Sequence, residues 1–525
     1  MTAAVDGQLL DSARRTIGAT IRAAAGEDLV KRIWDRDDTV WGKPGQAEVA
    51  DRLGWLSIAE RMSAAAPRLT DFAAKATADG LTDCVLLGMG GSSLAPEVFW
   101  RAFGPQAGGL TLHVLDTTDA EAIAAAPTEN TLYLVSSKSG GTIETLSAFH
   151  HFWDLTGGDG SRFAAVTDPH TSLESVAKER GFREVFLNDP DIGGRYSALS
   201  YFGLVPAALI GADIAGLLEG ALAAAERCRA TDQANPGLWL GCALGELAVA
   251  GHDKLTFVVD KPLTSLGLWA EQLVAESLGK QGKGILPIAD EPLVEPSQYG
   301  NDRVFLHVRS EPAPQLDAEL GALAATGHPV LSIAFSQARD LGAVMFVLEF
   351  ATAVAGWVIG VNPFDQPNVQ SAKDKTKDVL EHGADAIEPA SDADLAALLD
   401  AVPPAYLAIQ VYAAPSAAID AALARLRAEI VATHGIATTF GYGPRYLHST
   451  GQLHKGGPPV GRFLQILSAA EVDIAIPGES FTFEGLKRAQ ADGDLLTLRA
   501  AGFPAERLLL DGEIDALTSR LQGAL

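Results

Sequence analysis

Short apolar runs alternate with longer segments rich in Ala, Leu and Glu through the middle of the chain. In the first block the runs occupy residues 84–90, 110–116, 131–137, 163–168 and 184–189. Buried parallel strands form continuous apolar runs, and each needs a crossover segment, usually a helix, before the next. The pattern therefore predicts an α/β fold with a doubly wound, mainly parallel sheet.

The same alternation returns further along the chain. Apolar runs at residues 254–260, 303–309 and 328–335 follow a long helical region at residues 201–230. We expect a second α/β domain of the same kind. The predicted boundaries place the first domain at residues 45–230 and the second at residues 231–435.

Both ends of the chain are expected to add further structure. Residues 1–80 show amphipathic helical stretches, and residues 1–44 are predicted to form a helical N-terminal segment. Residues 436–525 contain further strand signals, such as the apolar run at 472–478, and are predicted to form a C-terminal α/β extension. The charged stretch at 373–394 is expected to be exposed.

Composition narrows the classes of partner. The chain has 525 residues and a net charge of −26, which argues against nucleic acid and anionic membranes. An anionic ligand would have to be bound by local cations, backbone N–H groups and helix N-termini. No apolar run reaches the ~18–20 residues of a membrane span, and the N-terminal sequence does not resemble a signal peptide. Three scattered cysteines fit a reducing compartment, so a cytoplasmic location is expected.

Two strand-to-helix turns of the first block are rich in glycine and hydroxyl side chains. Residues 88–93 read GMGGSS, and residues 135–145 read VSSKSGGTIET. Such turns lie at the carboxyl edge of a parallel sheet, where backbone N–H groups and helix dipoles attract anions. Together they predict a phosphate site, to which hydroxyl donors could come from Ser92, Ser137, Ser139 and Thr142.

These turns have three other interpretations. The serines and threonines could simply cap the following helices. A nucleotide-binding Walker A motif needs a Gly-Lys-Ser/Thr ending that neither turn has. A dinucleotide site is the stronger rival, because GMGGSS gives Gly-x-Gly-x-x-Ser and Asp116 ends the next strand. The third glycine is missing, however, and a second polar turn would be redundant for a pyrophosphate.

Five segments in order resemble the glucose-6-phosphate isomerase family, which is built from sugar-isomerase domains. They are GMGGSSLAP (88–96), SSKSGGTIET (136–145), GGRYSALS (193–200), AESLGKQGKGI (275–285) and NPFDQPNVQSAK (362–373). The set is similar to the isomerase portion of fused transaldolase/glucose-6-phosphate isomerase proteins, although this chain has no room for a transaldolase barrel. The resemblance implies two sugar-isomerase domains and reversible conversion of glucose 6-phosphate to fructose 6-phosphate in glycolysis and gluconeogenesis.

The resemblance also implies roles for single residues. Glu276 would be the base that moves a proton between C1 and C2, and Arg195 would stabilise the negative enediol(ate) oxygen. Lys373 would be catalytic, near the phosphate and the ring oxygen. Contacts to the sugar phosphate are implied for Gly90, Gly91, Ser92, Ser137, Lys138, Ser139, Thr142 and Gln366.

Each charged candidate also has a plainer interpretation. Glu276 could be solvated like Glu271 on the same helix, Arg195 could pair with Asp191, and Lys373 lies in a Lys/Asp-rich run. Only the ordered set of motifs favours the catalytic roles.

The ring-opening histidine departs from the order typical of the family. It should lie between Glu276 and Gln366, where His307 and His328 lack the expected neighbours. His448, in LHSTGQLHKGG at 447–457, matches better and is preferred, with His454 as the rival.

The resemblance pairs this histidine with Glu144 across two subunits. It therefore implies a homodimer with active sites at the subunit interface, in which Glu144 orients the imidazole. We expect no metal, because no cluster of His, Cys and Asp residues has the spacing of metal ligands. No cofactor is expected either.

The sequence leaves other functions open. The same site could also accept mannose 6-phosphate, or the chain could be a non-catalytic sugar-phosphate-binding regulator. A regulator would keep the phosphate loops and lose the catalytic glutamate and arginine, both of which are present. A nicotinamide-dependent dehydrogenase would bind its cofactor at GMGGSS.

Overall fold

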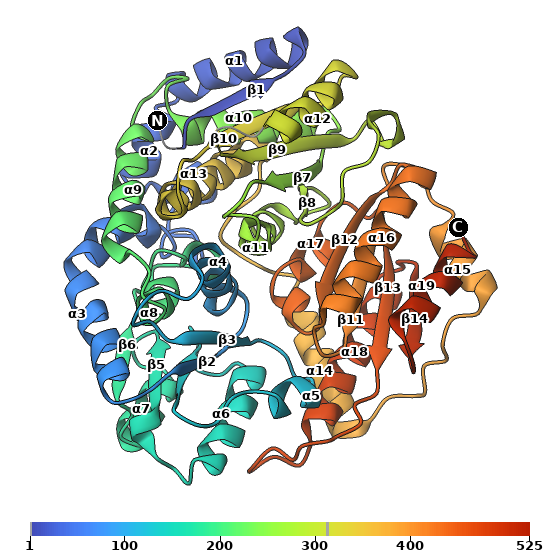
Figure 1. The fold of residues 1–525 in the computed structure, drawn as a ribbon. Coiled ribbons are helices and arrows are strands. Elements are labelled where there is room, and N and C mark those ends of the chain that lie inside the picture. Colours follow the sequence, from blue (N-terminus) through green and yellow to red (C-terminus); the bar gives the residue numbers. More distant parts are fainter. Residues whose placement is uncertain (1–2, 311–313) are drawn as a thin grey trace.

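A computed structural model describes residues 3–310 and 314–525 (Figure 1). Their strands form mainly parallel sheets. The first sheet has the order β3-β2-β4-β5-β6, and all its neighbours are parallel. Its strands are β2 (Asp83–Gly88), β3 (Thr111–Leu115), β4 (Thr131–Ser136), β5 (Phe163–Thr167) and β6 (Glu184–Leu187). The predicted parallel α/β fold is confirmed here.

Both faces of the first sheet are covered by helices. Successive side chains of a strand point to opposite faces, so Cys84 and Leu86 join one apolar cluster while Val85 and Leu87 join another. The helices on this part of the chain are α3 (Ile58–Ala78), α4 (Leu94–Phe103), α5 (Ala120–Ala124), α6 (Ile143–Leu155), α7 (Ser172–Glu179) and α8 (Tyr201–Leu209). Helix α6 packs against the cluster containing Val85.

The second sheet has the order β1-β10-β9-β7-β8. Its strands are β1 (Val5–Gln8), β7 (Lys254–Val259), β8 (Leu286–Ile288), β9 (Arg303–Arg309) and β10 (Val330–Ala334). They are parallel except for β1, which pairs antiparallel with β10. The N-terminal segment therefore is not wholly helical as predicted, because its first strand closes one edge of this sheet before α1 (Asp11–Gly26) and α2 (Leu29–Trp34) begin.

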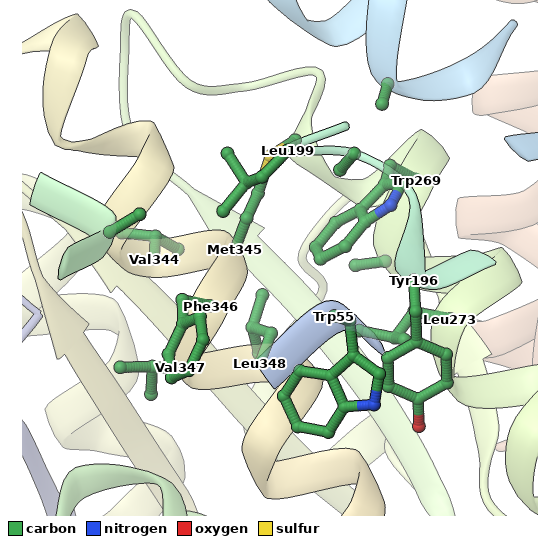
Figure 2. Close-up of a cluster of buried hydrophobic side chains, with 14 of the residues drawn as sticks. Trp55, Tyr196, Leu199, Trp269, Leu273, Val344, Met345, Phe346, Val347 and Leu348 are labelled. Atoms are coloured by element: carbon green, nitrogen blue, oxygen red, sulfur yellow. The ribbon is translucent and has the colours of Figure 1, made fainter. Parts of the chain in front are cut away.

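One apolar helix, α13 (Leu341–Ile359), forms the centre of the second domain. With the preceding turn it is long and apolar enough to cross a membrane, but 89% of its apolar window is buried inside the fold, as in the core helix of a globular protein. Figure 2 shows Val344–Leu348 packed beside Trp55 and Tyr196. The other helices of this region are α9 (Ile214–Arg227), α10 (Pro236–Val249), α11 (Leu266–Leu278) and α12 (Pro314–Ala325).

A third parallel sheet, ordered β12-β11-β13-β14, occupies the C-terminal part of the chain (orange and red in Figure 1). Its strands are β11 (Tyr406–Tyr412), β12 (Ala437–Tyr442), β13 (Gly461–Ser468) and β14 (Ala505–Leu510). The boundary predicted between residues 435 and 436 falls inside this sheet, because β11 pairs with both β12 and β13. We call residues 392–525 the C-terminal domain.

Six helices surround or lead into this third sheet. They are α14 (Gln370–His382), α15 (Asp392–Leu399), α16 (Ala417–His434), α17 (Gly451–Gly456), α18 (Phe483–Ala500) and α19 (Ile514–Gln522). Figure 1 places α14, α17 and α18 on the side of the C-terminal domain that faces the first two sheets.

Candidate active site

The loop from β4 to α6 is held together by its own hydroxyl groups. The hydroxyls of Ser137 and Thr142 lie 3.0 Å apart, and the backbone N–H of Gly140 donates to Ser137 Oγ at 3.1 Å. Gly140 has φ +69°, a left-handed conformation that favours glycine. Ser139 is exposed. The first turn of α6 adds N–H groups that lack intrahelical partners, so the loop has the form of an anion cradle.

The side chain of Lys138 is already engaged. Its ammonium forms an ion pair with Asp168 and donates to the carbonyl of Pro190 at 3.1 Å. Burial raises the pKa of Asp168, against the opposing effect of Lys138. An anion in this loop would therefore compete with Asp168 for the ammonium of Lys138.

The first glycine-rich turn is closely packed against three other motifs. A Cβ on Gly91 would lie 2.0 Å from the carbonyl oxygen of Gly194. A Cβ on Gly90, which has φ +54°, would lie 2.9 Å from Gln272 Nε2 and 3.0 Å from the carbonyl oxygen of His448. The glycines permit this approach, and Ser92 follows them in the same buried turn.

Arg195 is buried, and each of its three guanidinium nitrogens donates a hydrogen bond. It lies in the turn Gly194–Tyr196 and is 2% exposed. Its Nε donates to Ser277 Oγ at 2.8 Å and its Nη1 to Gln366 Oε1 at 2.9 Å. Its Nη2 donates to the carbonyl oxygens of Pro363 and Asp365. The turn therefore joins the segment at 193–200 to two motifs distant in sequence.

The carboxylate of Glu276 lies beside this guanidinium. Glu276 Oε1 is 3.4 Å from Arg195 Nη1, and Glu276 Oε2 accepts a hydrogen bond from Gln272 Nε2 at 3.0 Å. Gln272 lies one turn earlier on α11, so the helix itself supplies the amide. The buried carboxylate is thus held between a cation and an amide, and is not solvated on the helix surface.

His448 contacts Glu144 within the same chain. Its Nε2 lies 3.0 Å from Glu144 Oε1, to which Gln490 Nε2 also donates at 2.7 Å. Burial acts to raise the pKa of Glu144, but the charge and hydrogen bond of His448 outweigh it and hold that pKa below its ordinary value. The described chain makes this contact internally, and the expected homodimer with active sites at the subunit interface stays a prediction.

Lys373 is exposed on α14 and lies beside the same pair. It lines a cavity of about 270 Å³ together with Thr142, Glu144 and His448. Its positive charge contributes to the lowered pKa of Glu144. Glu276 and Arg195 are not among the lining residues of this cavity.

Three engaged polar residues were not singled out from the sequence. Gln272 had a signal, its place one helical turn before Glu276. Lys280 lies inside a quoted motif, and burial, followed by the nearby charge of Arg195, lowers its pKa to about 8. Gln490 lies on α18, far along the chain, and nothing in its neighbouring sequence marks it.

The structure separates the two candidate histidines. His454 is buried, its Nδ1 lies 2.9 Å from Tyr406 Oη, and burial lowers its pKa to about 3. It therefore stays neutral and is a packing residue, while His448 meets Glu144.

The dinucleotide interpretation is weakened, because the acidic residue it needs has another partner. Asp116, which it assigns to a ribose, instead accepts a hydrogen bond from Arg445 Nε at 2.8 Å. Within the described residues, no group of three or more His, Cys, Asp or Glu side chains is arranged to hold a metal ion.

The fold and these motifs define an α/β protein of the sugar-phosphate isomerase type, and comparisons with known proteins agree. The phosphoglucose isomerase family model matches residues 58–284. The glucose-6-phosphate isomerase of Rubrobacter xylanophilus is 30% identical over 361 residues, covering 58% of this chain and 83% of that protein. That of Synechococcus elongatus is 29% identical over 412 residues, covering 67% and 75%. This chain belongs to the phosphoglucose isomerase family.

Solved structures show the same fold. A hypothetical protein of Thermus thermophilus has a TM-score of 0.60 and 26% identity, covering 71% of this chain and all of that one. A glucose-6-phosphate isomerase from Chlamydia trachomatis has a TM-score of 0.54 at 20% identity, over 67% of this chain and 77% of that one. The segment matched by the family model contains both loops, Arg195 and Glu276, and ends before Lys373 and His448.

Proposed function

We propose that the protein interconverts glucose 6-phosphate and fructose 6-phosphate. The observation that carries this proposal is the buried carboxylate of Glu276, 3.4 Å from the Arg195 guanidinium and anchored by Gln272. Aldose–ketose exchange needs one base to move a proton between adjacent carbons and a fixed cation beside the oxygen that becomes negative. Glu276 and Arg195 supply both groups.

The phosphate is proposed to bind at the two glycine-rich turns. The proposed hydrogen-bond donors to the phosphate are the N-terminal N–H groups of α6 and the hydroxyls of Ser92, Ser137, Ser139 and Thr142. Because the ammonium of Lys138 is paired with Asp168, the phosphate would compete with that carboxylate for it. These donors would offset the strongly negative charge of the whole molecule.

Ring opening is assigned to His448. An ionised Glu144 accepts from His448 Nε2, which fixes the proton on Nε2 and leaves Nδ1 to exchange a proton with the ring oxygen. The C1 hydroxyl loses its proton as the C1–O5 bond breaks, and the ring oxygen gains one. Lys373 adds positive charge on the same side of the site.

Isomerisation then follows by proton transfer. Glu276 removes the proton from C2 of the open-chain aldose, and the electron pair moves into a C1–C2 double bond as negative charge develops on O1. We assign the stabilisation of that charge to the guanidinium of Arg195, whose Nη1 also donates to Gln366 Oε1 at 2.9 Å. The protonated Glu276 returns its proton to C1, and the O2 proton moves to O1, leaving a ketone at C2.

The test is a coupled assay of fructose 6-phosphate turnover, run with and without a chelator such as EDTA. Turnover that survives chelation supports this proton-transfer mechanism. Mannose 6-phosphate, assayed in parallel, is the comparison substrate for specificity. An inactive wild-type chain would refute the proposed reaction, and activity lost on chelation would refute the mechanism.

A further inference from the structure

A larger cavity, of about 470 Å³, lies apart from the candidate active site. Its walls come from α4 and α11 on one side and from α16 and β12 of the C-terminal domain on the other. Among the described residues, none lines both this cavity and the 270 Å³ cavity beside Lys373. Pockets for small molecules measure about 300–1,000 Å³, so this one has room for a ligand of its own.

The middle of the larger cavity is apolar. Ala421 and Ala424 lie three residues apart on one face of α16, and Leu268 of α11 and Phe440 of β12 line the cavity as well. The short alanine side chains leave the space that larger residues would fill. An apolar or aromatic group placed here would leave water, which favours binding.

Two of the arginines that line the larger cavity are already neutralised. Arg101 and Arg445 both form ion pairs with Glu97, and Arg445 also pairs with Asp116 at 2.8 Å. Two cations and two carboxylates balance one another in this group. The net charge of the cavity therefore depends on its other ionisable residues.

Those other residues make the larger cavity negative. Glu271, Asp290 and Asp420 all line it, and the two aspartates are exposed and so lie at its mouth. Arg427 is their counter-charge, and it donates to the carbonyl oxygen of Asp290 at 3.1 Å. Even with Glu271 protonated, two carboxylates face one guanidinium. A cationic ligand fits this balance better than an anionic one.

A buried amide lines the same cavity. Gln410 of β11 is 1% exposed, and neither its Oε1 nor its Nε2 has a hydrogen-bond partner among the described residues. Gln410 lies on the face of β11 that carries Ala408 and is opposite Gly441 of β12, and both of these residues line the cavity. Because an unpaired buried amide costs free energy, a polar group of a ligand would find a partner here.

We propose that the larger cavity binds a small organic cation. Its ammonium or guanidinium group lies at the mouth beside Asp290 and Asp420, its apolar body packs against α16, and a hydrogen-bonding group at its inner end meets Gln410. Within the described residues the carboxylates are not arranged to hold a metal ion, which favours an organic cation. The proposal goes beyond the isomerase function and does not rest on it.

The first test uses tyramine, which joins an ammonium group, an aromatic ring and a phenolic hydroxyl. Calorimetry on the full chain should show one site per chain, and saturating fructose 6-phosphate should leave it unchanged. 4-Hydroxyphenylacetate, which carries a carboxylate in place of the ammonium, should bind at least about tenfold more weakly. No binding of tyramine at about 10 mM, or equal binding of the carboxylate, would overturn the proposal.

Substitutions then locate the site. Asp420→Asn keeps an acceptor for Tyr442 and should weaken tyramine binding by about tenfold, whereas Asp71→Asn, on a 76% exposed side chain of α3, should not. Ala421→Phe should fill the cavity and abolish binding, and a cooperative thermal melt will show that this variant is folded. Wild-type affinity in both cavity variants would place tyramine elsewhere and refute the proposal.

Phenethylamine, which lacks the phenolic hydroxyl, tests the contact with Gln410. It should bind more weakly than tyramine, and equal affinities would remove Gln410 from the site. Calorimetry needs no turnover, so an inactive wild-type chain would refute the isomerase function and leave the result for this cavity standing.

Discussion

At the scale of single residues, α11 carries two buried glutamates on different sides. Glu276 faces Arg195, whereas Glu271 accepts from the backbone N–H of Ala289 at 2.9 Å and lines a separate cavity of about 470 Å³. Burial raises the pKa of Glu271 to about 8. The two carboxylates give a matched test of which one serves as the base.

We expect Glu276→Gln to lower kcat by about 10³-fold, because the amide cannot accept the C2 proton. Binding of fructose 6-phosphate, measured by calorimetry, should change little. Glu271→Gln keeps an acceptor for Ala289 and should retain activity within a few-fold. Near-normal turnover of Glu276→Gln would remove this residue from the mechanism.

The two histidines of residues 447–457 allow a second comparison. His448→Asn should lower kcat by about 10²-fold near neutral pH, because ring opening loses its acid–base group. His454→Asn breaks the contact with Tyr406 and should lower the melting temperature, while the folded fraction keeps its kcat. Steady-state kinetics together with thermal melts separate the two effects. Normal turnover of His448→Asn would contradict the assignment.

At the scale of elements, the first glycine-rich turn fits only because its glycines lack side chains. Gly91→Ala would place a methyl group 2.0 Å from the Gly194 carbonyl and should displace the turn that carries Arg195. We expect a loss of stability of roughly 2 kcal/mol or more and a marked drop in activity.

A glycine elsewhere provides the control for this change. Gly321 lies inside α12, and a Cβ there would meet nothing within 4 Å. Gly321→Ala should therefore stabilise the protein by up to ~1 kcal/mol through helix propensity, with unchanged kinetics. Urea unfolding measures both variants, and equal effects would show that the close packing at Gly91 is unimportant.

The elements that could be predicted from the sequence were those with a strong local pattern. Strands such as Thr131–Ser136 are continuous apolar runs and were found, and so were the turns that follow them. Strand Val5–Gln8 was missed because it is short and half polar, and its place depends on pairing with a strand some 300 residues later. For the same reason, no local pattern could show that β11 belongs with β12.

The same distinction between local patterns and long-range contacts applies to the residues of the site. The ordered motifs pointed to Glu276 and Arg195, and the structure brings these two together. The contact of His448 with Glu144 inside one chain depends on how three domains dock, and so does the part played by Gln490. Such contacts leave no periodicity or spacing in the sequence.

At the scale of the whole molecule, the buried core around α13 contains an acidic group. Glu349 is fully buried, and neither of its carboxylate oxygens has a hydrogen-bond partner among the described residues. Burial raises its pKa well above the ordinary value, so the folded protein holds it protonated. The unfolded chain loses that proton above about pH 4.5.

The free energy of unfolding should therefore fall as pH rises above 4.5, by at most about 1.4 kcal/mol per pH unit from this group. Glu349→Gln removes the ionisable group and should flatten the dependence of unfolding free energy on pH. The variant should therefore become more stable relative to the wild type as pH rises toward 8. Glu226→Gln, on an 80% exposed side chain, should leave the slope unchanged. Urea unfolding between pH 5 and 8 measures this, and parallel slopes for Glu349→Gln and the wild type would refute it.

The order of Glu276 and His448 along the chain has a consequence for synthesis. The phosphate loops and Glu276 leave the ribosome first, and the histidine and Gln490 follow more than 150 residues later. At ~5–20 residues per second, a nascent chain spends roughly 10–30 s with its base made and its histidine missing. The proposed isomerase activity therefore cannot begin before His448 has been made, however early Glu276 and the loops have folded.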